Sequence, residues 1–278
     1  MDSEKVFRAW GLPDDFLDRN WRRAHATGRV VDPADVPGGL TEDEIGELLG
    51  QGLRADRVSV STRGRLHHPA EFTTARTIAG RPVADVVDPE QVHRLLDSGA
   101  TAVLANAELW VPRATRLAEV LAEDFGCEVQ AHVFLTGAGH AGLVPHADGE
   151  DNFLVQLAGS KTWSVWEHDG VGAQRIDASA LGDPTAVVTL TPGDVLYIPV
   201  GWVHAATAGE GGSTHITYQV VPESLVDAVL DQLGDELEEV LGDRLKPAPG
   251  DDPLPAEQVT ALVRDLVELL DRRAEGNG

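Results

Sequence analysis

The chain has 278 residues, of which 42% are apolar, so it can bury the core of one large domain or of one domain with an appendage. Its 22 basic and 46 acidic residues give a formal net charge of −24, which argues against binding to nucleic acid or to an anionic membrane surface. The same charge suits a basic protein or peptide as partner, and it equally suits solubility alone. The single cysteine, Cys127, excludes an intramolecular disulfide and a multi-cysteine metal site.

The sequence shows no sign of export or of membrane insertion. The first residues, Met1 to Glu4, are not followed by the apolar segment of a secretory signal. No apolar run approaches the ~20 residues that a membrane-spanning helix needs. We therefore expect a cytoplasmic protein that does not bind membranes.

Residues 1–73 are expected to form short helices and irregular segments that pack on the main domain. Residues Thr41 to Glu44 have the pattern of a capping box, which predicts a helix that ends at Gly50. A short strand is predicted over residues 58–61.

The main domain is expected over residues 74–221, and its first half contains two predicted helices. The sequence Asp88-Pro89-Glu90 begins the first of them, which ends before Gly99. The second runs from about Ala114 to Phe125. An apolar strand is predicted between the two helices, over residues 100–105.

The rest of the main domain is predicted to be β-structure. Residues 127–136 alternate in character, which predicts a strand with one face in the cavity of a barrel. Glycine- and proline-containing turns are predicted at 159–160, 191–194 and 209–212. The clearest strands lie at 163–166, 187–190, 195–198, 203–207 and 214–221. Many short strands with such turns indicate a sandwich or a jelly roll.

The sequence His146-Ala147-Asp148 carries the strongest chemical signal. Residues i and i+2 of a strand point to the same face, so this imidazole and carboxylate can converge on one metal ion. A third ligand is expected downstream, and His204 is the best candidate because it begins a predicted strand. Two histidines and one carboxylate form the facial triad of non-haem Fe(II) oxygenases, which leaves open positions at the metal.

Neighbouring residues decide between a metal site and a simple turn. A His-x-Asp pair alone is weak, because Asp148-Gly149 is also a good turn dipeptide. The metal interpretation is favoured by the apolar run from Phe153 to Leu157, which predicts a buried strand. It is also favoured by Lys161, which lies on the strand expected after the turn at 159–160, and by the tight turn of Pro199 to Gly201 before the second histidine.

A family motif runs through the same region. The chain contains, in this order, His146, Asp148, Gln156-Leu157-Ala158-Gly159, Lys161 and Trp163. This order resembles the motif of the JmjC/cupin-like 2-oxoglutarate oxygenases, and most closely that of their ribosomal-oxygenase branch. The resemblance extends from about Thr74 to Val221. It implies a mainly β fold, the double-stranded β-helix (a jelly roll), with helices packed outside it.

The resemblance also implies a site. Fe(II) would be held by His146, Asp148 and His204, with 2-oxoglutarate as co-substrate and O2 as oxidant. Lys161 is placed to bind the far carboxylate of 2-oxoglutarate. A lysine on an apolar strand face calls for an anionic partner, although it could instead extend to water at the strand end. Asn152 is expected near the co-substrate. Further candidates lie on the last strand: His215, Thr217 and Gln219.

Three other histidines are interpreted as loop residues. His67 and His68 are adjacent, and neighbouring residues of a strand face opposite ways, so they are poorly placed to share a metal. His140 lies in the glycine-containing loop 136–140, which could close over a substrate. The proposed triad is complete without it.

Residues 222–278 change to helical periodicity. Two amphipathic helices are predicted, around residues 225–241 and 259–270, with a proline-rich linker between them. Their apolar stripes either pack on the barrel or pair with the same region of a second chain. The resemblance favours a homodimer, because ribosomal oxygenases carry a helical dimerisation region at this place.

These patterns favour an Fe(II)- and 2-oxoglutarate-dependent hydroxylase that acts on a side chain of a protein or peptide, with a ribosomal protein as one candidate. One alternative is a hydroxylase of a small metabolite or of a peptide natural product. Another is a metal-binding cupin without oxygenase activity. Lys161 argues against the second alternative, because a simple cupin needs no cation for a distal carboxylate.

Overall fold

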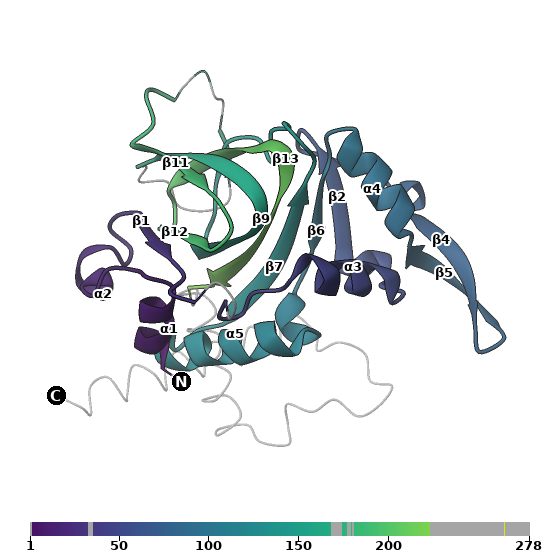
Figure 1. The fold of residues 1–278 in the computed structure, drawn as a ribbon, viewed down its shortest axis with the longest axis horizontal. Helices are drawn as coiled ribbons and strands as arrows, with labels where there is room; N and C mark the ends of the chain where they lie inside the picture. Colours follow the sequence, from purple (N-terminus) through teal and green to yellow (C-terminus); the bar gives the residue numbers. More distant parts are fainter. Residues whose placement is uncertain are drawn as a thin grey trace. The chain divides into compact units, whose positions relative to one another are not determined.

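Two long antiparallel strands form the centre of the fold in the computed structural model (Figure 1). They are β9 (Asp151–Trp166) and β13 (Val203–Val220), and they pair with each other along their length. Both belong to the compact unit Met1–Pro222. The structure describes residues 2–32, 36–167, 174–176, 179, 181–222 and 264. The predicted C-terminal helices lie outside these residues, apart from Arg264.

Among the described residues, β9 and β13 belong to a sheet of eleven strands, and all of its pairings are antiparallel. Its main order is β1-β12-β9-β13-β7-β6-β2-β3, while β11 pairs with β9, and β8 pairs with both β10 and β13. The remaining strands are β1 (Ala26–Arg29), β2 (Val58–Thr62), β3 (Arg65–Leu66), β6 (Thr101–Leu104), β7 (Val129–Thr136), β8 (His146–Ala147), β10 (Gln174–Arg175), β11 (Ala186–Leu190) and β12 (Asp194–Ile198).

The two long strands each pass from one wall of the fold to the other. The first half of β9 pairs with β12, and its second half pairs with β11. The first half of β13 pairs with β8, and its second half pairs with β7. These two walls form a double-stranded β-helix, so the predicted jelly roll is confirmed (Figure 1).

Two predicted turns are wrong, because they are bends within the long strands. Residues 209–212 lie within β13 and residues 159–160 within β9. Gly159 and Gly212 have left-handed φ values of 61° and 76°. A Cβ on Gly159 would lie 2.1 Å from the carbonyl oxygen of Gly212, so the strands approach too closely here for a side chain. Glycine suits a turn and a bend equally, and the neighbouring strand decides between them.

The described helices begin and end close to the predicted places. The capping box of α3 (Glu42–Gly50) makes both of its hydrogen bonds. Asp88 caps α4 (Pro89–Asp97), and α5 (Pro112–Phe125) ends at Gly126 in a left-handed conformation. None of the helices in the described part is long and apolar enough to span a membrane. The other helices are α1 (Ser3–Ala9), α2 (Phe16–Arg19), η1 (Ala55–Arg57), η2 (Pro69–Glu71) and η3 (Ala107–Leu109).

The alternation of the central strands separates a helix-covered core from a cavity. Val133 and Ile216 are fully buried in the core, which also includes side chains of α1 and α5. Their neighbours Phe134, His215 and Thr217 line the cavity on the other face. This confirms the predicted alternation of β7. Burying each large apolar side chain contributes about 1.5–3 kcal/mol, so the core fixes the register and thereby the residues of the cavity.

The part predicted to be irregular contains strands as well as helices. The strand expected over 58–61 is present as β2, while β1 was not predicted because Ala26–Arg29 lacks an apolar alternation. β1 instead joins the sheet through backbone pairing with β12.

A separate two-stranded sheet, β4 (Thr73–Ile78) and β5 (Arg81–Val87), projects as a hairpin beside α4 (Figure 1).

Candidate active site

Backbone pairing brings the two predicted metal-binding histidines together. His146 lies on β8 and His204 near the start of β13, and the two residues are directly opposite in the antiparallel pair. The N–H of Gly201 donates to the carbonyl oxygen of Asp148 at 2.9 Å. This bond ties the loop after β8 to the turn before β13. The three side chains therefore come from two segments that the backbone holds side by side.

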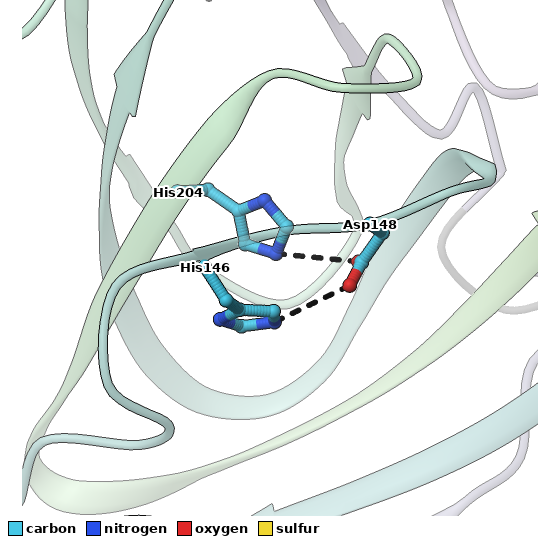
Figure 2. Close-up of side chains that lie close together, drawn as sticks. All are labelled: His146, Asp148 and His204. Atoms are coloured by element: carbon cyan, nitrogen blue, oxygen red, sulfur yellow. Dashed lines mark ion pairs between the residues drawn. The ribbon is translucent and has the colours of Figure 1, made fainter. Parts of the chain in front are cut away.

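The side chains of His146, Asp148 and His204 point toward a common centre (Figure 2). Nε2 of His146 lies 3.5 Å from Oδ1 of Asp148, and Nε2 of His204 lies 3.5 Å from Oδ2. One ligand atom from each residue lies within 4.8 Å of the others. Ligand atoms at about 2.1 Å from one metal ion and at right angles to each other are ~3 Å apart. The observed spacing is close to that geometry.

Both imidazoles are held with Nε2 available to a metal. Nδ1 of His146 lies 2.8 Å from the carbonyl oxygen of Val144, and Nδ1 of His204 lies 3.2 Å from that of Trp202. A carbonyl oxygen only accepts, so each Nδ1 donates a hydrogen, and each Nε2 faces the carboxylate of Asp148. Burial lowers the pKa of His204 to about 4, which keeps this ring neutral at pH 7.

Asn152 lies beside the carboxylate of the triad. Its Nδ2 donates to Oδ2 of Asp148 at 3.0 Å, and its Oδ1 accepts from Nε2 of Gln219 at 3.0 Å. Asn152 is 3% exposed, so these bonds form away from bulk water. The pair therefore fixes the orientation of the carboxylate. The sequence predicted Asn152 to lie near the co-substrate, and in the structure its side chain bonds to Asp148, Gln219 and the backbone of Glu150.

Lys161 lies on the same cavity as the triad and is 3% exposed. Its Nζ donates to Oγ1 of Thr136 at 3.2 Å and lies 5.1 Å from the ring centroid of Trp163. No carboxylate of the described residues lies within 4.0 Å of this ammonium group. Burial lowers the pKa of Lys161 from its ordinary value of 10.5 to about 7. Such a group gains most from an anionic ligand.

Two further polar atoms near Lys161 lack hydrogen-bond partners among the described residues: Nε1 of Trp163 and Nδ1 of His215. The ring of His215 stacks on Phe134 at 4.8 Å and meets Trp163 edge-on at 5.4 Å. Burial holds the pKa of His215 well below its usual range, so the ring is neutral. Thr217, two residues further on β13, also lines the cavity. Buried orphan groups of this kind are the mark of a site built for a polar ligand.

The two ends of the cavity fit the groups that the sequence predicts. Two histidines and a carboxylate form a donor set suited to Fe(II) with open positions. A buried cation with no acidic partner in the described part of the chain suits the remote carboxylate of 2-oxoglutarate. Residues 104–227 match the JmjC domain family. Over these residues the chain is similar to JmjC domains. The triad and Lys161 all lie within the matched residues.

The chain is similar in sequence to three kinds of relative. Ribosomal oxygenase 1 of Rattus norvegicus is 28% identical over 220 residues, which cover 74% of this chain and 34% of that protein. Ribosomal oxygenase 2 of Bos taurus is 38% identical over 122 residues, or 42% of this chain and 25% of that protein. The bifunctional lysine-specific demethylase and histidyl-hydroxylase NO66 of Drosophila melanogaster is 31% identical over 153 residues, which cover 52% of this chain and 23% of that protein. The chain thus spans 34% or less of each of these relatives.

A solved structure shares the fold. The ribosomal oxygenase YcfD of Escherichia coli, in complex with cobalt and 2-oxoglutarate, matches with a TM-score of 0.56 at 18% identity. The match covers 92% of this chain and 65% of that one. The two chains therefore share the double-stranded β-helix fold.

Sequence reasoning missed a buried carboxylate beside the triad. Asp151 is fully buried, and it accepts from the hydroxyl of Tyr197 at 2.6 Å, the backbone N–H of Val200 at 3.2 Å and Nε of Arg22 at 2.9 Å. These bonds join the start of β9 to β12 and to the turn that precedes His204. An aspartate at the head of an apolar strand signals that partners are needed, but the pattern does not say which residues supply them.

The remaining histidines have structural contacts. His67 bonds to Oγ1 of Thr62 and, through Nδ1, to Glu71 at 2.9 Å, while His68 caps η2. The ring of His140 packs over Gly99, where an added Cβ would come within 2.8 Å of Nδ1. Within the described residues the triad is the one cluster of three potential metal ligands.

Proposed function

We propose that the chain is an Fe(II)- and 2-oxoglutarate-dependent oxygenase that hydroxylates a side chain of a protein or peptide. One observation carries this proposal: a single cavity contains both an open His-Asp-His cluster and a buried lysine without an acidic partner in the described chain. The names of the relatives support it, because they include ribosomal oxygenases and a histidyl-hydroxylase.

At the metal end, His146, Asp148 and His204 would hold Fe(II), an ion that this set of donors suits. The backbone carbonyls that receive the two Nδ1 hydrogens keep Nε2 aimed at the metal. Asn152 keeps the carboxylate in place through its bond to Oδ2. Such outer partners orient the ligands and raise the affinity for the metal.

At the other end, Lys161 binds the remote carboxylate of 2-oxoglutarate, and Thr136 holds the ammonium group in position. His215 and Thr217 line the same space, and we propose that they contact the co-substrate. Bound Fe(II), with 2-oxoglutarate and O2, supplies the oxidation: one C–H of the target becomes C–OH while 2-oxoglutarate is converted to succinate and CO2. Trp163, Phe134 and Leu154 keep bulk water away from this region.

We also propose a polypeptide substrate with a net positive charge, and a ribosomal protein is the first candidate to test. The chain carries a net charge of −24, which speeds the approach of a cationic partner. Raised ionic strength should therefore slow turnover of such a substrate, because exposed charges are screened over about 10 Å at 0.1 M salt. Turnover that is insensitive to salt would contradict this steering.

The deciding experiment for the reaction class is release of CO2 from 2-oxoglutarate in the presence of Fe(II) and O2, without added substrate. A metal-binding cupin that is not an oxygenase predicts no release. Mass spectrometry of proteins and metabolites from cell extract, before and after incubation with enzyme, then separates a polypeptide substrate from a small molecule. Oxygen added only to metabolites would contradict the polypeptide assignment.

We further propose a cytoplasmic homodimer. Its support is the pair of apolar stripes predicted after Pro222 and the resemblance to ribosomal oxygenases. Sedimentation of the full chain over a range of concentrations should show a dimer. A monomer at all concentrations would contradict the assembly and leave the chemistry unaffected.

A further inference from the structure

A surface groove lies beside the catalytic cavity and shares part of its wall. Leu143, Ala205 and Ala206 line both the groove and the cavity. The groove is also lined by Thr162 and Ser164 of β9 and by Thr207 of β13, whose side chains alternate along the strands with those of the cavity. The groove therefore adjoins the cavity at Leu143, Ala205 and Ala206.

Arg63 is the charged residue of this groove among its described lining residues. Its side chain is exposed, and it has no carboxylate partner in the part of the chain that the structure describes. The surrounding segment is also positive: residues 54–81 contain six arginines and two acidic residues, a formal charge of +4 in a chain of −24. The groove thus presents an available cation within an otherwise acidic protein.

The backbone at Arg63 is unfavourable for an arginine. Arg63 and Gly64 form the two-residue turn between β2 and β3, with φ values of 50° and 77°. Both central residues of such a turn have positive φ, and asparagine, aspartate or glycine suits the first of them better than arginine does. A strained position of this kind points to a role for the side chain rather than for the turn.

We propose that this groove receives the substrate polypeptide and that Arg63 pairs with an acidic residue that flanks the hydroxylated one. The inference rests on the proposed function and adds a sequence preference to it. It is compatible with a partner of net positive charge. The net charges act on approach and are screened over about 10 Å, whereas Arg63 acts on one neighbouring carboxylate at contact.

The test compares peptides that differ at one position. Oxidised peptides are first identified by mass spectrometry after incubation of digested cell extract with wild-type enzyme, Fe(II), 2-oxoglutarate and O2. The best peptide is then synthesised with its flanking acidic residue unchanged, changed to the amide, or changed to lysine. Wild-type enzyme should prefer the acidic version by roughly twofold to fivefold in KM, the range of an exposed ion pair.

Variants of the groove assign the preference to one side chain. Arg63→Glu should reverse the preference toward the lysine peptide. Arg63→Asn should abolish the preference while the protein stays folded, because asparagine suits the left-handed turn. Arg65→Glu is the matched control: it lies two residues away, is exposed and does not line the groove, so the preference for acid should persist.

Two readouts separate this inference from the proposed function. Release of CO2 from 2-oxoglutarate without substrate should be unchanged in all three variants, because Arg63 and Arg65 lie outside the catalytic cavity. Peptide binding is measured separately, without 2-oxoglutarate, on an array of random peptides with a fixed aspartate or a fixed lysine. Binding that prefers aspartate through Arg63 supports the inference even if no CO2 is released. The same preference in wild type and Arg63→Glu would overturn it.

Discussion

The triad end and the Lys161 end of the catalytic cavity differ in whether their polar atoms have hydrogen-bond partners. At the metal end, the atoms that do not face the centre have partners: both Nδ1 atoms donate to carbonyl oxygens, and Asp148 accepts from Asn152. At the other end, Lys161 has one hydroxyl partner, and Nε1 of Trp163 and Nδ1 of His215 have none among the described residues.

This difference separates a prearranged site from one that is completed by its ligand. Partners at the metal end fix the orientation of the three ligand residues before a metal binds, so less order has to be gained on binding. Unsatisfied groups at the lysine end cost stability until an anion reaches them. The co-substrate should therefore stabilise the folded protein as well as react in it.

The largest expected effect comes from the metal end. Asp148→Ala removes the anionic ligand of the triad, and we expect metal affinity and turnover both to fall by more than about 100-fold, because even outer partners of metal ligands contribute about 10- to 100-fold. Calorimetric titration with metal and the rate of CO2 release measure the two quantities. His67→Ala and His140→Ala serve as controls and should keep both, since their contacts lie elsewhere. Full metal binding by Asp148→Ala would rule out the site.

The next effect comes from the lysine end. Lys161→Ala removes a charge-assisted contact worth about 1.5–3 kcal/mol, so the concentration of 2-oxoglutarate needed for half-maximal turnover should rise about tenfold to a hundredfold. Metal affinity should change little, because the ammonium group of Lys161 contacts Thr136 and Trp163 rather than the triad. An unchanged requirement for 2-oxoglutarate would show that this lysine does not bind the co-substrate.

A smaller effect is expected from removing Asn152, which orients the carboxylate of Asp148. Asn152→Ala leaves the three ligand atoms in place but removes the bond to Oδ2 of Asp148. Metal affinity should fall about tenfold, the lower part of the range for such partners. Asn152→Asp would place a second carboxylate beside that of Asp148 and should not restore the metal affinity. Wild-type affinity in Asn152→Ala would mean that the carboxylate needs no orienting partner.

The last expected effect is a dependence of stability on pH. Lys161 has a folded pKa of about 7 and an ordinary value of 10.5, so between these pH values the unfolded chain binds more protons than the folded one. The free energy of unfolding should therefore rise with pH in this window, by at most about 1.4 kcal/mol per pH unit. Below pH 7 the destabilisation is complete.

Lys161→Met lacks this titration and serves as the reference. Denaturant unfolding of both proteins from pH 7 to pH 10 should show the variant to be the more stable at pH 7, with a gap that narrows as pH rises. Saturating 2-oxoglutarate with metal should also narrow the gap at pH 7. If the free energies of unfolding of the two proteins instead changed in parallel with pH, Lys161 would have an acidic partner or reach water.

Sequence spacing was informative wherever the relevant contact is local or repeats along a strand. The His-x-Asp spacing placed His146 and Asp148 near each other, and the alternation of β9 placed Lys161 on the buried face with Trp163. The capping box of α3 was read correctly because all its contacts fall within four residues.

Contacts between distant segments could not be read in this way. The hydroxyl partner of Lys161, Thr136, lies 25 residues away, and Arg22 and Asp151 are separated by 129 residues. The bends at Gly159 and Gly212 depend on how closely two strands cross, which neither local sequence records. These features follow from the assembled sheet, so they become visible only in the structure.

The bent pair of β9 and β13 also has a consequence for how the site opens. Asn152, Lys161 and Trp163 lie on one of these strands and His204 and His215 on the other, and backbone bonds pair the strands on both sides of the bends. A one-residue slip of either strand would turn each of these side chains to the opposite face. Amide hydrogens along both strands should therefore exchange with solvent only when the whole domain unfolds, and no partial opening should expose the cavity by separating them.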